Sequence, residues 1–472
     1  MATNPLFFPV KWNRIFLFLV PLFTVHFAYA QVGLERWETS NDKSSLLSKM
    51  PPLTPSSPGS GSAESIKIDP NKKYQSVDGF GFALTGGSAQ HLIHMKSAER
   101  KTLLQELFGT GPGQVGISYI RVSIGASDLN EFVFSYNDLK AGEVDPSLKK
   151  FSLAQDEKDV VPVLKEILAI SPKIKIMGSP WSAPIWMKSN NNIQGGRLKD
   201  EYYSAYANYF VKYIKAMAAH GVVLDAITIQ NEPFNDGNTP SMQFFAKEEM
   251  RFIRDHLGPL FKQNKIKTKI VLYDHNCDAP EYPISILADE EAAKYIDGSG
   301  FHLYAGQTSA MSKVHDAFPD KNLYFTEMMA VSRDGGFNTA NPVGRILIGS
   351  LRNWSRNVIL WNLAADPQNK PYTDNGGCSI CQGAITIDGD KVTRNLAYYV
   401  IAHASKFIPE GSVRIESNAT SKVSNVAFLT PQGKRVLIVS NNSTEPQSIS
   451  VEEGKQSFSY TINKASTITH IW

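Results

Sequence analysis

The sequence predicts an α/β protein: a (β/α)8 TIM barrel with an appended antiparallel β-sandwich domain. Three observations support this fold class. Short β-rich runs alternate with helical patterns between residues 75 and 395, which is typical of parallel βα units. Two of those runs end on a glutamate. Residues 408–472 then change to alternating apolar and polar residues between Asn, Ser and Gly turns, which is typical of antiparallel strands.

Eight runs in the first region have the composition of barrel strands. They lie around residues 79–85, 118–124, 175–179, 226–230, 270–273, 298–303, 323–326 and 358–361. Helical patterns separate them, at residues 97–108, 157–170, 200–220 and 242–261, with a last helix at 394–407. In the third helix the large apolar residues recur at steps of three and four, namely Tyr203, Tyr206, Phe210, Tyr213 and Met217. Eight strand-and-helix units fit a barrel of roughly 250 residues or more.

Composition and charge exclude several classes of protein. The chain has 472 residues, of which 42% are hydrophobic and 20% charged, so it is long enough for one large folded domain and a smaller one. The formal net charge is only +3, and no run of Lys and Arg follows the first residues. These values argue against nucleic acid or an anionic membrane surface as a partner.

Residues 1–30 have the layout of a secretory signal peptide. Lys11 and Arg14 precede an apolar run at 15–23, and the small-residue pattern of Ala28 and Ala30 precedes Gln31. Cleavage near Ala30 would leave a secreted or periplasmic protein with no stable membrane insertion. The alternative is a membrane anchor, but the run is short and contains Pro21, and no stop-transfer flank follows it.

A linker is predicted between the signal peptide and the barrel. Residues 31–50 mix polar and apolar residues, and residues 51–62 are rich in Pro, Ser and Gly. A segment of that composition cannot pack into a core, so residues 51–62 are expected to form a surface linker.

Three cysteines are too few to build the fold on a disulfide framework. Cys378 and Cys381 form a C-x-x-C pair in the Gly-rich loop at 375–383, and Cys277 follows a predicted strand. A redox or zinc site and a local loop disulfide are both compatible with the pair. We favour the disulfide, because zinc needs further ligands and no neighbouring histidine supplies them.

Glu232 and Glu327 are the strongest candidates for catalysis. Each lies at the exit of a buried strand, about three strand-and-helix units apart. All strands of a (β/α)8 barrel end on the same face, so the two carboxyl groups are expected to converge on one site. Cleavage of an acetal needs one carboxylic acid and one carboxylate, and this pair supplies both.

Aromatic residues follow other strands of the same face. Trp181, Tyr304 and Trp361 each lie at a strand exit, and Asn231 precedes the first glutamate. Flat rings at the rim of a polar pocket suit stacking on a sugar, although core packing is the more common fate of any single ring. Three rings on one barrel face favour a sugar site.

Six motifs in this order resemble glycoside hydrolase family 30, which includes glucosylceramidases and endo-β-1,6-glucanases. They are DGFGFA at 78–83, YIRVSIGASD at 119–128, SPWSAP at 179–184, QNEP at 230–233, FTEM at 325–328 and WNLA at 361–364. The resemblance extends from about residue 34 to the C-terminus. It implies a clan-A barrel and a side β-sandwich built from the C-terminal strands together with the segment after the signal peptide, residues 31–50.

Transferred position by position, the resemblance implies a retaining double displacement. Glu232 would be the acid/base and Glu327 the nucleophile. Asn231 would bind the sugar 2-hydroxyl, and Arg121 would lie against the nucleophile and keep it ionised. We therefore expect a low pKa for Glu327, a raised pKa for Glu232, and a separation of about 5–5.5 Å between the two carboxyl groups.

The resemblance also implies a binding site for the non-reducing sugar. Asp128 and Trp181 would hold that sugar, and Tyr304 and Trp361 would line the same subsite. The mechanism requires no metal ion or organic cofactor, and the sequence shows no cluster of metal-ligand residues. Asp274 and His275 end the fifth predicted strand, where contact with a second sugar and a structural hydrogen bond are both possible.

The loop at 365–383 bears on the substrate. It differs from the animal glucosylceramidases and looks more like the bacterial β-1,6-glucanase branch, and loops on this barrel face set specificity. The leading hypothesis is a secreted endo-β-1,6-glucanase whose partner is a β-glucan. The alternatives are a glucosylceramidase acting on a glucosyl lipid, an exo-β-glucosidase, and, from another class, a non-catalytic carbohydrate-binding protein. The sequence does not predict the oligomeric state.

Overall fold

The computed structural model describes residues 1–10, 33–55, 64–331 and 342–472. The chain divides into two units, Met1–Val32 and the compact unit Gly33–Trp472. Most of the predicted signal peptide lies outside the described residues, so that prediction stays open. Among the helices described, none has both the length and the apolar character needed to span a bilayer.

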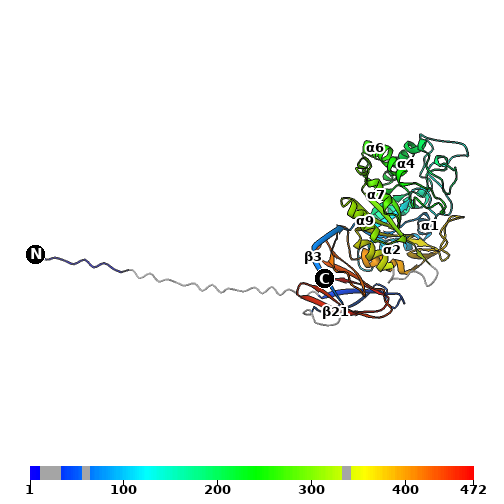
Figure 1. The fold of residues 1–472 in the computed structure, drawn as a ribbon. Helices are drawn as coiled ribbons and strands as arrows, with labels where there is room; N and C mark the ends of the chain where they lie inside the picture. The colour runs from blue at the N-terminus through cyan, green and yellow to red at the C-terminus, as the bar shows by residue number, and fades with distance from the viewer. Residues whose placement is uncertain (11–32, 56–63, 332–341) are drawn as a thin grey trace. The chain divides into compact units, whose positions relative to one another are not determined.

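Eight parallel strands form the barrel, as predicted (Figure 1). In chain order they are β4 (Gly79–Phe82), β5 (Tyr119–Ser123), β6 (Lys175–Ser179), β7 (Ala226–Thr228), β8 (Lys269–Cys277), β9 (Gly298–Gly306), β10 (Asn322–Glu327) and β12 (Ser355–Leu360). The order in the sheet is β4-β12-β10-β9-β8-β7-β6-β5. The first and last strands close the ring, because Ser118 N donates to Phe80 O at 3.0 Å and Leu84 N donates to Arg121 O at 2.8 Å. The predicted fold class is confirmed.

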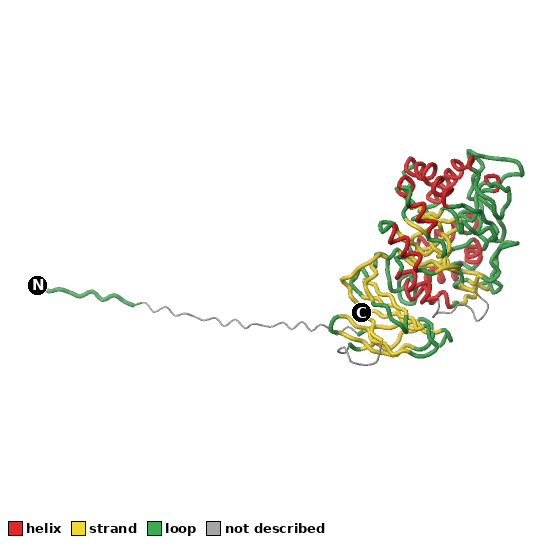
Figure 2. Tube along the Cα trace, viewed as in Figure 1, coloured by secondary structure: helices red, strands yellow, loops and turns green. Residues whose placement is uncertain are grey.

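Helices surround the barrel strands, and Figure 2 shows them in red around the yellow strands. Their bounds are α1 (Gly86–His94), α2 (Ser97–Phe108), α3 (Val160–Ile170), α4 (Tyr203–Ala219), α5 (Ala246–Phe252), α6 (Gly258–Gln263), α7 (Glu281–Leu287), α8 (Glu290–Ala293), α9 (Ser309–Ala317), α11 (Gly349–Arg352) and α12 (Leu396–Ser405). The five large residues predicted to form one face of α4 are all buried.

The helix predicted at 242–261 differs from the structure. It begins only at Ala246, where the Glu248 carboxylate accepts the Phe245 N–H at 3.0 Å and caps the first turn. A π-helical turn, Ile253–Leu257, then separates α5 from α6. Pro259 has no N–H to continue an α-helical ladder, which accounts for the irregular turn just before it.

The barrel interior changes from apolar to polar toward the carboxyl ends of the strands. A fully buried layer consists of one residue from each of six strands, namely Tyr119, Met177, Ala226, Val271, Tyr324 and Ile359. Side chains two positions further along a strand point to the same face. Four of those next positions hold Arg121, Ser179, Thr228 and Thr326, all buried. The packed base of the barrel therefore supports a polar floor beneath the strand exits.

Nine strands form the β-sandwich. They are β1 (Leu34–Ser40), β2 (Ser48–Leu53), β3 (Glu64–Ser76), β17 (Val413–Ser417), β18 (Ser424–Leu429), β19 (Arg435–Asn441), β20 (Gln447–Glu453), β21 (Gln456–Ile462) and β22 (Ser466–Ile471), in the order β2-β1-β22-β19-β18-β17-β3-β20-β21. A separate apolar cluster that includes Ile66, Leu437 and Ile449 forms its core. The pairing is antiparallel except between β20 and β3, which run parallel.

The predicted linker at 51–62 needs a correction at its start. Pro51, Pro52 and Leu53 belong to β2, which pairs with β1 and is the edge strand of the sheet. An edge strand tolerates proline because its outer N–H groups have no partner strand. Residues 56–62 lie outside the described residues. Strand β3 was not predicted, although its alternating Ile66 and Ile68 were a signal for a strand.

Candidate active site

A cavity of about 430 Å³ opens at the carboxyl ends of the barrel strands. Six of the predicted site residues line it, namely Asp128, Trp181, Glu232, Tyr304, Glu327 and Trp361. A larger cavity of about 640 Å³ lies among the loops that follow β5 and β6, and neither glutamate lines it. Volumes of both sizes suit small ligands, so the convergence of the two carboxyl groups makes the smaller cavity the candidate active site.

Glu232 is presented on an unusual backbone conformation at the exit of β7. Its φ of 49° lies in the left-handed region, which a residue with a side chain rarely adopts. Two hydrogen bonds hold that conformation: Glu232 N donates to Asp274 O at 3.0 Å, and Asn235 N donates to Glu232 O at 2.8 Å. Such conformations cluster at functional sites, where the surrounding structure stabilises them.

Glu327 is the last residue of β10 and is held by two donors. Arg121 Nη1 donates to its Oε2 at 2.5 Å, and the Tyr304 hydroxyl donates to its Oε1 at 2.9 Å. Arg121 is fully buried, and its guanidinium lies over the Trp181 ring at 4.8 Å from the centroid. The arrangement matches the position expected of Arg121 against the proposed nucleophile.

Arg121 also organises the neighbouring polar groups. Its Nη2 donates to Asn231 Oδ1 at 2.7 Å and to Asp274 Oδ2 at 2.6 Å. Asp274 is fully buried and accepts further hydrogen bonds from Ser179 and Thr326. Of the two alternatives for Asp274, the structure therefore shows the structural hydrogen bond, whereas His275 lines the cavity.

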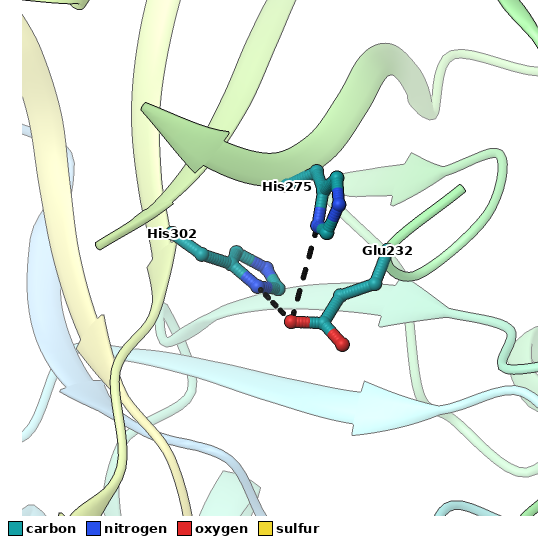
Figure 3. Close-up of side chains that lie close together, drawn as sticks. All are labelled: Glu232, His275 and His302. Atoms are coloured by element: carbon teal, nitrogen blue, oxygen red, sulfur yellow. Dashed lines mark hydrogen bonds and ion pairs between the residues drawn. The ribbon is translucent and has the colours of Figure 1, made fainter. Parts of the chain in front are cut away.

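His302 joins the two halves of this network and was not singled out from the sequence. Its Nδ1 lies 3.2 Å from Glu232 Oε1 (Figure 3). Its Nε2 lies 3.0 Å from Asp274 Oδ1. The other oxygen of Glu232, Oε2, accepts from Asn235 Nδ2 at 2.6 Å. A signal was available, because His302 is two residues before Tyr304 on β9 and so faces the same side of the sheet.

The two carboxyl groups lie close together. His302 Nδ1 is 3.2 Å from Glu232 Oε1 and 3.8 Å from Glu327 Oε1, so these oxygens are at most 7.0 Å apart, the sum of the two distances. This limit lies at the lower end of the range of about 6.5–9.5 Å that suits an inverting enzyme. The narrower value of about 5–5.5 Å stays a prediction.

The pKa directions of the two glutamates are the reverse of those expected from the sequence. Burial alone would raise the pKa of Glu232, but hydrogen bonding and charge from His302 outweigh it and lower that pKa. For Glu327, burial raises the pKa more than His302 and Arg121 lower it. Burial would lower the pKa of His302, but the Glu327 charge and the bonds to Asp274 and Glu232 raise it to about 9. The raised pKa of His302 and the lowered pKa of Glu232 favour the histidine as the carrier of the proton that the pair shares.

Glu232, His275 and His302 place one ligand-type atom each within 4.8 Å of one another. This group was not predicted, because the three residues are distant along the chain. Their spacing and donor types are compatible with a divalent cation. We interpret His302 and Glu232 as a proton-sharing pair instead, since His302 Nδ1 is already hydrogen-bonded to Glu232.

The loop after the eighth barrel strand contributes one wall of the cavity. Cys378 and Cys381 form a disulfide, which confirms the favoured alternative for this pair, and both residues line the cavity. Cys381 belongs to a short strand, β14 (Cys381–Gln382), that pairs with β11 (Ala330–Val331) just after Glu327. Cys381 also packs with Trp181 and Trp361, whose rings stack at 5.1 Å.

Comparison with known families identifies both parts of the chain. The model of the glycosyl hydrolase family 30 TIM-barrel domain matches residues 77–408, and that of the family 30 β-sandwich domain matches residues 411–470. The chain belongs to glycoside hydrolase family 30. The predicted family, and with it a retaining clan-A glycoside hydrolase, are confirmed.

Several known proteins resemble this family-30 hydrolase over most of its length. An endo-1,6-β-D-glucanase of Aspergillus fumigatus is 33% identical over 81% of this chain and 82% of its own. The lysosomal acid glucosylceramidase of Mus musculus is 30% identical over 86% of this chain and 83% of its own. The structure of the endo-β-1,6-glucanase BT3312 superposes with a TM-score of 0.85, at 32% identity, over 93% of this chain and 99% of the other.

Proposed function

We propose that this family-30 hydrolase is an endo-β-1,6-glucanase. The observation that supports this substrate is the similarity to proteins named endo-1,6-β-glucanase, at 32–34% identity over 78–93% of the chain. The geometry supports a glycosidase of that kind, because the cavity combines two carboxyl groups with aromatic side chains and hydrogen-bonding groups. The alternative of a non-catalytic binding protein is set aside, since both glutamates are present in one cavity.

In the proposed reaction Glu327 attacks the anomeric carbon, and the bond to the leaving oxygen breaks. Glu232 gives that oxygen a proton, so the leaving sugar departs as an alcohol and a glucosyl ester forms on Glu327. Water then attacks the ester after giving a proton to Glu232, which releases the sugar and restores Glu327. Asn231 would bind the 2-hydroxyl, and the remaining predicted site residues, Asp128, Trp181, Tyr304 and Trp361, would surround the same sugar.

The hydrogen bond between His302 and Glu232 supplies the proton for the first step. The pKa directions of the pair favour His302 as the carrier of this proton, and its Nδ1 lies 3.2 Å from Glu232 Oε1. Once the leaving oxygen approaches Glu232, transfer along this bond would leave a neutral imidazole and a protonated carboxyl group. The Asp274 carboxylate holds the other ring nitrogen and so keeps the histidine in the orientation that the transfer requires.

A glucosylceramidase is the second candidate, because the mouse lysosomal acid glucosylceramidase matches over 86% of the chain. An exo-β-glucosidase uses the same chemistry on the end of a chain. The products distinguish the three. Short oligosaccharides would appear early from β-1,6-glucan if the action is endo, whereas an exo enzyme would release glucose alone and a glucosylceramidase would act on the lipid.

The decisive experiment compares the mature enzyme with its Glu327→Gln variant on β-1,6-glucan and on glucosylceramide micelles. We expect early β-1,6-linked oligosaccharides from the glucan with the wild type and none with the variant. Glucose released from the lipid, with no product from the glucan, would overturn the proposed substrate.

We further propose that the protein is exported. The support is the basic start, the apolar run and the small-residue site of residues 1–30. N-terminal sequencing of protein recovered outside the cytoplasm should begin at Gln31. A protein retained with residue 1 intact would contradict export.

A further inference from the structure

We propose that Phe234 and His275 form the binding site for the leaving-group sugar, the sugar on the acid/base side of the bond that is cut. The inference rests on the proposed function, because it takes the ligand to be a β-linked sugar. Phe234 would provide an aromatic surface for the ring, and His275 would bind one of its hydroxyl groups. Phe234 was not predicted as part of the site, and contact of His275 with a second sugar was one of the two alternatives that the sequence left open.

Phe234 is an exposed aromatic residue at the mouth of the cavity. It follows Glu232 by two positions, lines the cavity and remains 40% exposed, although apolar rings are normally covered. Neighbouring rings hold it in place, with Tyr282 at 5.4 Å and His275 at 5.7 Å between centroids, both steeply tilted to it. A ring fixed in this way provides contact area at little cost in conformational entropy.

The position of Phe234 relative to Glu232 assigns the side of the scissile bond. The general acid must touch the leaving oxygen, so the leaving sugar lies against the segment that carries Glu232. Residues of that segment surround the carboxyl group: Asn235 Nδ2 donates to Oε2 at 2.6 Å, and Asn238 Nδ2 donates to the same oxygen at 3.3 Å. Phe234 belongs to this segment, whereas Asp128, Trp181 and Trp361 come from other strand exits.

His275 provides a second, independent observation. It is only 7% exposed, and its Nδ1 has no hydrogen-bond partner in the described part of the chain. This nitrogen lies 3.9 Å from Glu232 Oε1 and is directed toward it, as Figure 3 shows. A buried polar atom without a partner costs free energy, and a hydroxyl group beside the leaving oxygen would supply the missing hydrogen bond.

The lining of this part of the cavity favours a sugar over an acyl chain. Three amides, those of Asn235, Asn238 and Asn276, line the cavity together with Phe234 and His275. Amide and imidazole groups pair with hydroxyl groups, while burial against a hydrocarbon chain would leave them unsatisfied. One aromatic surface surrounded by such groups is the usual form of a site for a sugar ring.

The test compares two substrates that differ in the leaving group. The leaving group of a β-1,6-linked glucotriose is a sugar, whereas the leaving group of β-D-glucosyl fluoride is a fluoride ion. For Phe234→Ala and for His275→Ala we expect kcat/KM on the trisaccharide to fall about tenfold or more, with little change on the fluoride. Phe234→Tyr should restore most of the loss. Phe132→Ala is the matched control, since Phe132 is an exposed ring that does not line this cavity.

Parallel losses on both substrates would overturn the proposal, because they would indicate a general disturbance of the active site. Unchanged kinetics on the trisaccharide would also overturn it. A second readout does not depend on the natural substrate: glucosyl-enzyme formed from the fluoride partitions between water and an added methyl β-glucoside acceptor. Phe234→Ala should lower transfer to the sugar relative to hydrolysis, and an unchanged ratio would contradict the inference even if β-1,6-glucan is not the substrate.

Discussion

The two glutamates of the site differ in the side chains that surround their carboxyl groups. Glu327 accepts from an arginine and a tyrosine, while Glu232 accepts from a histidine that also binds Asp274. The first set of partners suits a carboxylate that must attack as an anion. The second set suits a carboxyl group that gains and loses a proton in each half of the reaction, because its neighbour can carry that proton.

The two glutamates should respond differently to the leaving group. Glu232→Gln should lower kcat/KM on a β-1,6-linked oligosaccharide by about 10²–10⁴-fold, the usual contribution of a general acid. The same variant should change kcat/KM on β-D-glucosyl fluoride only slightly, because fluoride departs without a proton. Glu327→Gln should abolish turnover of both substrates, as measured by glucose and fluoride release. Equal losses for the two variants on the fluoride would contradict the assigned roles.

The pH dependence of kcat/KM should report the proton shared by His302 and Glu232. The pKa of His302 is raised to about 9, so this proton is present at neutral pH, and activity should be lost as the pH rises through about 9. His302→Asn removes the group that carries it, and the alkaline limb should move down by about one to three pH units. The control is His220→Asn, because His220 is a half-buried histidine that is bonded to Glu157 and does not line the cavity. An unmoved limb in His302→Asn would exclude the proton relay.

At the scale of elements, the site depends on strand alternation and on one loop. Two-residue alternation along the barrel strands places Arg121, Ser179, Thr228 and Thr326 above an apolar layer. The loop after β12 then closes one side of the cavity through the Cys378–Cys381 disulfide and the pairing of β14 with β11. The strands thus position the catalytic groups, and the loop shapes the space beside them.

Reduction of the disulfide should therefore affect substrate binding more than turnover. The closed loop is short, so its loss should cost only about 2 kcal/mol of stability. We expect KM to rise several-fold while kcat stays within about twofold, because Arg121 and His302 hold the glutamates independently of this loop. The Cys378→Ser/Cys381→Ser variant should behave like the reduced enzyme and should not respond to reductant. A fall in kcat with an unchanged KM would contradict the view that the loop affects binding and the strands position the catalytic groups.

On the scale of the whole molecule, a buried histidine connects the barrel with the sandwich. His403 lies in α12, and its ring nitrogens are each 2.8 Å from a threonine hydroxyl, that of Thr39 in β1 and that of Thr469 in β22. Burial lowers the pKa of His403 to about 3, and burial likewise lowers that of His470 in β22 to about 3. Both residues are therefore neutral in the folded protein.

These two histidines should make the fold sensitive to acid. An unfolded histidine takes up a proton below about pH 6.5, whereas the folded ones do so only near pH 3. The free energy of unfolding should fall as the pH drops below about 6.5, by up to about 1.4 kcal/mol per pH unit for each histidine. Urea unfolding at pH 7.5, 6.0 and 5.0 measures this slope. His403→Gln should reduce it, and an unchanged slope would contradict the assignment.

The elements and the two glutamates could be predicted from local patterns. All eight barrel strands and the exits that carry Glu232 and Glu327 follow from runs of neighbouring residues. Other features could not be predicted in this way. Strand β3 was not predicted, and the pKa directions of the two glutamates were reversed, because the full burial of Glu327 and the contact of Glu232 with His302 were not visible in the sequence. The environment of a carboxyl group depends on residues brought together only by closure of the barrel.

By itself the sequence determined the barrel, the sandwich, the family and the two carboxyl groups of the cavity. Strand periodicity and motif order are properties of adjacent residues, so they survive without coordinates. Only the tertiary structure showed that His302 lies between Glu232 and Asp274 and that Phe234 remains exposed at the cavity mouth. It also showed that, among the residues described, His275 Nδ1 has no hydrogen-bond partner. Burial and hydrogen bonding between residues distant along the chain are set by how the strands close into a ring, and no local pattern encodes that closure.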